Sequence, residues 1–89
     1  MMYPYIVLWD ETEICHSQIL TKGGQKMVEV HFEKPVESGF CSARCILPEY
    51  KWLFNEGFTD DEMSFFDEFL HHNAHLIFKY AETGGIHCA

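Results

Sequence analysis

The chain has 89 residues, of which 47% are hydrophobic and 16% are aromatic, and it carries a formal net charge of −8 at pH 7. This length predicts one domain spanning residues 1–89, and so apolar a composition argues against intrinsic disorder. No apolar run approaches the ~20 residues that a membrane-spanning helix needs, and the start MMYPYIVLWDE lacks the basic residues of a signal peptide. We therefore expect a cytoplasmic protein that does not insert into membranes.

The negative charge is concentrated in the second half of the chain. Residues 1–48 carry six acidic and four basic side chains, whereas residues 49–89 carry eight acidic and two basic ones. Because such a surface repels phosphate groups, we expect no nucleic-acid binding, and a basic protein is the favoured partner.

The first half of the chain reads as a series of β-strands. The segment 26–33 alternates Val28, Val30 and Phe32 with mostly polar residues, which is typical of a half-buried antiparallel strand. Gly23 and Gly24 predict a hairpin turn in front of it. Composition and flanking breaks predict four strands, at residues 3–9, 12–20, 26–33 and 40–47.

The segment 49–55, EYKWLFN, predicts a short helix. Pro48 is favourable in a first helical turn, and Tyr50, Leu53 and Phe54 recur at helical spacing. Trp52 lies off this apolar stripe.

The segment 59–82 predicts one long amphipathic helix. Thr59 and Glu62 form the pattern of a capping box, and Gly84 with Gly85 marks the end. Asn73 interrupts the apolar side of the helix, and Phe78 lies among the polar residues. The apolar arc comprises Met63, Phe65, Phe66, Phe69, Leu70, Ala74, Leu76, Ile77, Tyr80 and Ala81.

Strands followed by helices predict an α+β fold. We expect a three- to four-stranded antiparallel β-meander over residues 1–47 and a helical part over residues 48–83. The long helix is expected to pack on one face of the sheet, and residues 84–89 form a tail.

The cysteines stand at positions 15, 41, 45 and 88. Thiols stay reduced in the cytosol, so we expect no disulfide framework. Cys41 and Cys45, on one strand, would lie about 13 Å apart, too far for a disulfide, and small buried side chains are the expected role.

Asp67, His71 and His75 are spaced four residues apart and therefore share one strip of the helix. Two imidazoles at this spacing, with a carboxylate one turn earlier, can ligate Zn²⁺. The alternative is a set of weak charge pairs on a wet helix surface.

The sequence contains no phosphate-binding loop, dinucleotide fingerprint, nucleophile elbow or CxxC pair, which favours a protein without enzymatic activity or cofactor. A hydrolase would need a pocket that unites a cysteine and a histidine. The leading hypothesis is a small acidic protein-interaction or regulatory module, antitoxin-like or inhibitor-like by analogy. The alternative is a metal-binding protein.

This hypothesis depends on the wide apolar arc of the long helix, which one small sheet would leave partly uncovered. The uncovered part, together with Trp52 and Phe78, predicts a surface for a protein partner or for a second copy in a homodimer.

Overall fold

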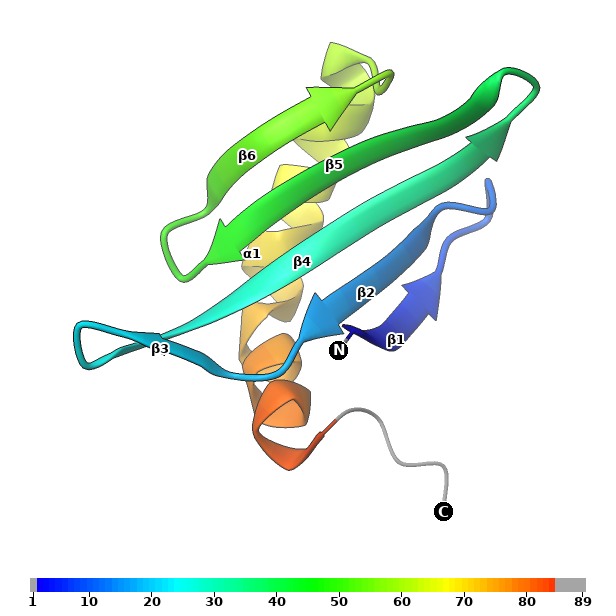
Figure 1. Cartoon of the computed structure of the whole chain (residues 1–89). Helices are drawn as coiled ribbons and strands as arrows, with labels where there is room; N and C mark the ends of the chain where they lie inside the picture. Colours follow the sequence, from blue (N-terminus) through cyan, green and yellow to red (C-terminus); the bar gives the residue numbers. More distant parts are fainter. Residues whose placement is uncertain (1, 85–89) are drawn as a thin grey trace.

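Six antiparallel strands followed by one helix make up the α+β fold of the computed structural model, which describes residues 2–84 (Figure 1). The elements are β1 (Met2–Val7), β2 (Glu13–Ser17), β3 (Leu20–Lys22), β4 (Gln25–Val36), β5 (Gly39–Leu47), β6 (Lys51–Glu56) and α1 (Asp60–Thr83). The predicted fold class is confirmed, with more strands and fewer helices than expected. Of the predicted tail, residues 85–89 lie outside the described residues.

The strands follow the order β1-β2-β4-β5-β6, so β1 and β6 form the two edges. The short β3 pairs with the first residues of β4, and the predicted turn between them is confirmed. Gly23 and Gly24 have φ angles of 58° and 80°, which glycine adopts without steric cost. This hairpin extends beyond the body of the sheet (Figure 1).

The single strand predicted over residues 12–20 is two strands, β2 and β3. The paired register of β2 with β4 ends at His16 opposite Val30. At the next position the Ser17 hydroxyl accepts a hydrogen bond from the Glu29 backbone N–H (2.9 Å) and donates one to the Gln18 carbonyl (2.7 Å). A side chain thus replaces the backbone partner, and the strand ends there.

The prediction of a short helix over residues 49–55 is wrong, because residues 51–56 form the edge strand β6. Trp52 lies opposite Cys45 and Phe54 lies opposite Arg44, so Leu53 is an extra residue in a β-bulge. The bulge breaks the two-residue alternation of a strand. The apolar residues therefore recur at a spacing that resembles a helix.

The predicted long helix is confirmed in position and in its end signals. The Thr59 hydroxyl accepts a hydrogen bond from the Glu62 N–H (3.2 Å), and the Glu62 carboxylate accepts one from the Thr59 N–H (2.9 Å). Gly84 ends the helix with a φ of 83°, and its N–H donates to the Tyr80 carbonyl.

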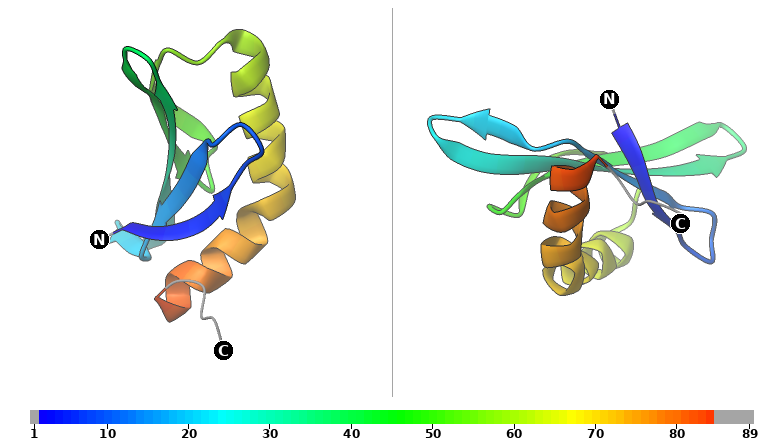
Figure 2. Two further views of the ribbon diagram at one scale, coloured as in Figure 1. Left: turned by 90° about the vertical axis from the view of Figure 1, so that its right-hand side faces the viewer. Right: turned by 90° about the horizontal axis from the view of Figure 1, so that it is seen from below.

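The core lies between α1 and one face of the sheet, and Figure 2 shows that no helix or strand formed by residues 2–84 covers the opposite face. Phe66 is central to it, because its ring stacks on Phe32 (centroids 4.6 Å apart) and meets Phe58 edge to face (4.9 Å). The buried apolar side chains are Ile14, Val28, Val30, Phe32, Ala43, Cys45, Leu47, Phe58, Phe66, Leu70, Ile77 and Ala81.

Asn73, which interrupts the apolar arc, has its hydrogen bonds satisfied at the margin of the core. Its side-chain oxygen accepts from the Tyr5 hydroxyl (2.8 Å), and its amide donates to the Phe69 carbonyl (2.9 Å). A buried amide without partners would be costly, so this pairing explains why asparagine is tolerated here and ties β1 to α1.

Within residues 2–84, no helix combines the length and the apolarity that a membrane crossing requires.

Replacing Leu70, which is 0% exposed, by alanine is expected to lower the free energy of unfolding by about 2–5 kcal/mol, because it leaves a cavity under α1. The control is Leu53→Ala in β6, where the side chain is 48% exposed and the expected loss is under about 1 kcal/mol. Urea denaturation followed by circular dichroism measures both. Equal losses would contradict the burial of Leu70 between α1 and the sheet.

Candidate functional site

The most exposed aromatic side chain among the described residues is Trp9, in the loop between β1 and β2. It is 78% exposed, and its ring meets that of Phe65 on α1 edge to face with centroids 5.2 Å apart. Phe65 belongs to the predicted apolar arc, yet it remains 39% exposed. The helix therefore does leave part of its apolar arc uncovered, on the side that faces β1.

The loop that carries Trp9 is held by its own hydrogen bonds. The Leu8 N–H donates to the Thr12 carbonyl (2.9 Å), and the Glu11 N–H donates to the Leu8 carbonyl (3.0 Å). The Asp10 carboxylate accepts from the Thr12 N–H (3.1 Å), as in an Asx turn. Trp9 thus projects from an ordered tight loop, and little conformational entropy remains to be lost there on binding.

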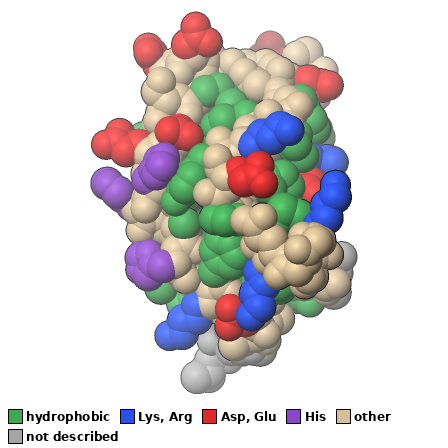
Figure 3. All heavy atoms as spheres, turned by 90° about the vertical axis from the view of Figure 1, so that its left-hand side faces the viewer, with side chains coloured by type: hydrophobic (Ala, Val, Ile, Leu, Met, Phe, Trp, Pro, Cys, Tyr) green, Lys and Arg blue, Asp and Glu red, His purple; other side chains and the backbone are tan. Residues whose placement is uncertain are grey.

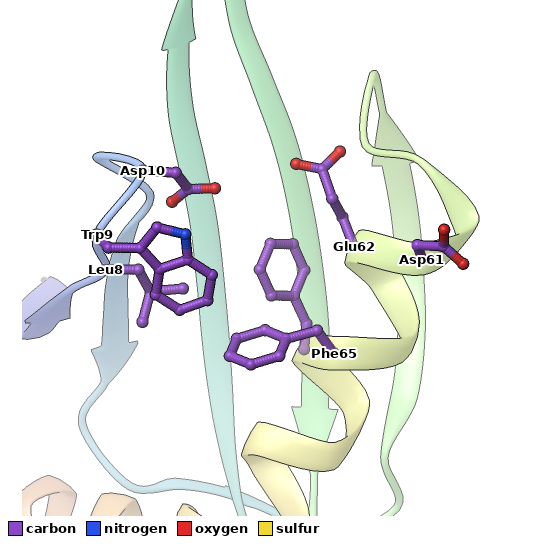
Figure 4. A pocket seen from close by; sticks show the side chains of 7 residues that line it. Leu8, Trp9, Asp10, Asp61, Glu62 and Phe65 are labelled. Atoms are coloured by element: carbon purple, nitrogen blue, oxygen red, sulfur yellow. The ribbon is translucent and has the colours of Figure 1, made fainter.

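Trp9 and Phe65 form two walls of a hollow of about 230 Å³, here called the Trp9 pocket (Figure 4). Its lining consists of side chains from the β1–β2 loop and from the first turns of α1. The lining residues are Leu8, Trp9, Asp10, Asp61, Glu62, Phe65 and Phe66. Figure 4 shows the aromatic rings inside the pocket and the Asp10 and Glu62 carboxylates turned toward each other at its rim.

Lys34 of β4 joins the two sides of the pocket. Its ammonium lies 3.1 Å from a Glu62 oxygen and 3.6 Å from an Asp10 oxygen. Hydrogen bonding from the Thr59 N–H, reinforced by Lys34, lowers the pKa of Glu62. The pKa of Asp10 is also lowered: burial acts to raise it, but hydrogen bonds from Thr12 and the charge of Lys34 prevail. Both carboxylates are therefore ionised at neutral pH.

A second hollow, of about 350 Å³, continues from the Trp9 pocket along α1 and is here called the helix groove. It is lined by Phe65, Glu68, Phe69, His72 and Asn73, so the Phe65 ring is shared by both hollows. The two hollows thus form one apolar surface with carboxylates beside it.

Trp52 and Phe78, the predicted interaction residues, lie elsewhere. Both are partly buried against the core, and the Trp52 ring contacts Phe32 with centroids 5.4 Å apart. Figure 3, which views the molecule from the left-hand side of Figure 1, shows apolar side chains across the middle of this side, with histidines along one margin and acidic and basic side chains among and around them. Trp52 is thus engaged in packing against the core.

Two of the three predicted metal ligands lie close together. An Asp67 oxygen is 3.6 Å from Nε2 of His71, while His75 is exposed one turn further along α1. The His71 ring also stacks on Tyr50, with centroids 3.8 Å apart and planes inclined by 10°. Within residues 2–84, no three histidine, cysteine or acidic side chains are grouped so as to hold a metal ion.

The described cysteines, Cys15, Cys41 and Cys45, are free thiols. Burial, with a smaller effect of Asp67, raises the pKa of Cys45 to about 12. Cys15 lies opposite His31 in the β2–β4 register, but burial and the charges of two glutamates raise the pKa of its thiol as well. A catalytic cysteine needs a lowered pKa, so neither thiol has the environment of a nucleophile.

No local signal in the sequence marks Trp9 as a site residue, because it reads as the last residue of a strand. Its exposure results from the loop that begins after Val7 and from the position of α1, both of which depend on tertiary structure. The apolar arc did point to uncovered helix surface, and Phe65 is its most exposed member.

Replacing Glu62 by glutamine is expected to lower the free energy of unfolding at pH 7 by roughly 0.5–1.5 kcal/mol, because it weakens the capping box and the contact with Lys34. The pKa of Glu62 is lowered in the folded state, so its contribution is present above about pH 4.3 and is lost as pH falls through the folded pKa. The variant should therefore lose less stability on acidification. Urea denaturation between pH 7 and pH 3 measures this.

The matched control for this prediction is Glu68→Gln, which removes an exposed carboxylate from the same helix. An acid dependence that is identical in wild type and Glu62→Gln would contradict the role given to the Glu62 carboxylate.

Comparison with protein-family models, with curated proteins and with solved structures finds no match to this chain.

Proposed function

We propose that this protein is a small interaction module, without enzymatic activity, that binds a basic protein partner through the Trp9 pocket. The observation that carries the proposal is the 78% exposed tryptophan, held on an ordered loop against Phe65 and beside a hollow. Exposed aromatic anchors in rigid settings are typical of binding hot spots, because they bury a large apolar area at little entropic cost.

The charges around the pocket favour a basic partner. Asp10, Asp61 and Glu62 line the Trp9 pocket, and Glu68 lines the helix groove. Lys34 is the cation that pairs with two of these four carboxylates, so the lining retains a negative charge. Opposite charge on a partner would speed its association and fix its orientation.

By analogy with inhibitors and antitoxins, a binding protein of this kind would act by occupying the basic surface of another protein. A cytoplasmic location agrees with the free thiols of Cys15, Cys41 and Cys45.

The test is affinity capture with four immobilised proteins: wild type, Trp9→Ala, Phe65→Ala and the control Leu53→Ala, which removes an exposed leucine far from the pocket. A true partner is retained by wild type and by the control, is lost from both pocket variants, and is released by salt. With the purified partner, calorimetry should show affinity weakened at least tenfold by either pocket substitution, or about 1.4 kcal/mol. A partner that binds all four proteins equally well would overturn the proposal.

A second candidate function, metal binding, is supported by the 3.6 Å contact between Asp67 and His71. Elemental analysis of the natively purified protein separates the two functions. Stoichiometric zinc that disappears in the double variant His71→Ala, His75→Ala would support the metal site. A metal-free protein whose partner binding survives this double substitution is the result expected from the interaction module.

A further inference from the structure

The two hollows along α1 together define the shape of what can occupy them. On α1, the Trp9 pocket is lined by positions 61–66 and the helix groove by positions 65–73, so their centres are offset by about six residues. At ~1.5 Å per residue this offset corresponds to about 9 Å along the helix axis. An occupant that fills both hollows must place two apolar side chains about this far apart.

A partner helix meets this spacing well. Residues one heptad apart on an α-helix lie on the same face and are separated by ~10.5 Å. On an extended strand, side chains on one face are separated by ~6.7 Å or by ~13 Å, and both distances differ from about 9 Å by more than the heptad distance does.

The neighbouring sheet edge is also a poor template for an added strand. Pro4 lacks an N–H, and the register of β1 shifts between Pro4 and Ile6. Both features interrupt the regular row of backbone groups on which strand addition depends. The occupant is therefore better held by side-chain contacts in the hollows than by backbone pairing with β1.

Charge defines the flanks of the occupant. Asp61 and Glu68 stand seven residues apart on α1, beside the Trp9 pocket and the helix groove respectively. Among residues 2–84 neither has an ion pair, whereas Lys34 is engaged by Glu62 and Asp10. Two lysines or arginines on the partner, also about one heptad apart, would meet these carboxylates.

The same charges argue against a second copy of this chain as the occupant. In a two-fold symmetric dimer through this surface, α1 would face α1, and like carboxylates would be brought together.

We propose that the partner segment is a basic amphipathic α-helix, with two apolar residues one heptad apart in the Trp9 pocket and the helix groove and with lysine or arginine beside Asp61 and Glu68. This inference rests on the proposed function and specifies its ligand. It corresponds to the helix-in-groove mode of recognition, in which a few apolar anchors on one helix face supply most of the affinity.

The test uses three synthetic 20-residue peptides that are helical in solution and differ in one feature each. The first has leucines at i and i+7 with lysines on the flanks; the second moves one leucine to i+5, which places it on another face; the third replaces the lysines by glutamates. Binding to the full chain is measured by calorimetry, and the contact surface is mapped by amide chemical-shift changes in the ¹⁵N-labelled protein.

The first peptide is expected to bind at least tenfold more tightly than either of the other two. Its shift changes should cluster at residues 8–10 and 61–73. Phe65→Ala and Trp9→Ala should each weaken it at least tenfold, whereas Leu53→Ala should leave it unchanged. Circular dichroism checks that the variants are folded, and Trp9→Ala, which removes a side chain outside the core, keeps the test valid if Phe65→Ala is destabilised.

Equal binding of all three peptides would overturn the helix inference. So would binding of the first peptide that neither Trp9→Ala nor Phe65→Ala weakens. The proposed function fails separately, when a captured natural partner is insensitive to Trp9→Ala and Phe65→Ala. A partner that depends on both residues but binds as an extended chain, as shown by the backbone chemical shifts of its own labelled binding segment in the complex, leaves the function standing and refutes the helix.

Discussion

The architecture depends on one contact, the burial of a stripe of α1 against a single face of the sheet. Phe66, Leu70 and Ile77 are each at most 2% exposed, and they meet a sheet surface of Val28, Val30 and Phe32. A helix stripe of this kind is narrower than the apolar arc of α1, which spans about half of the circumference. Part of the apolar arc therefore remains at the margin of the contact, and Phe65 is its most exposed residue.

Lys34 connects this packing to the candidate site. It extends from the central strand β4 to Glu62 at the start of α1 and to Asp10 in the β1–β2 loop. The first turn of the helix, the loop and the sheet are thereby held together around one ammonium group. Because Trp9 and Asp10 are neighbours in the loop, the same contact helps to hold the exposed tryptophan near Phe65.

Features that depend on residues close together in the sequence could be predicted, whereas features that depend on distant residues could not. The helix boundaries were predictable because Thr59, Glu62 and Gly84 act within a turn of their own positions. The strand β6 was not, because the bulge at Leu53 is set by pairing with β5, a partner that the local pattern does not contain. The split between β2 and β3 likewise depends on Glu29, which is twelve residues from Ser17.

The candidate site was predictable only in outline. The apolar arc indicated uncovered helix surface, but Trp9 joins Phe65 across 56 positions of sequence, and only the fold brings them together. Trp52 and Phe78, which lie off the local patterns, are both partly buried and pack against the core.

The irregular outer strands bear on how the chain behaves at high concentration. Pro4 and the register shift disturb β1, and the bulge at Leu53 disturbs β6, so neither border of the sheet offers a straight, continuous ladder to another molecule. Stacking of copies into amyloid-like fibrils needs such a ladder. The protein can therefore expose the aromatic side chain of Trp9 to solvent and still resist polymerisation through the edges of its sheet.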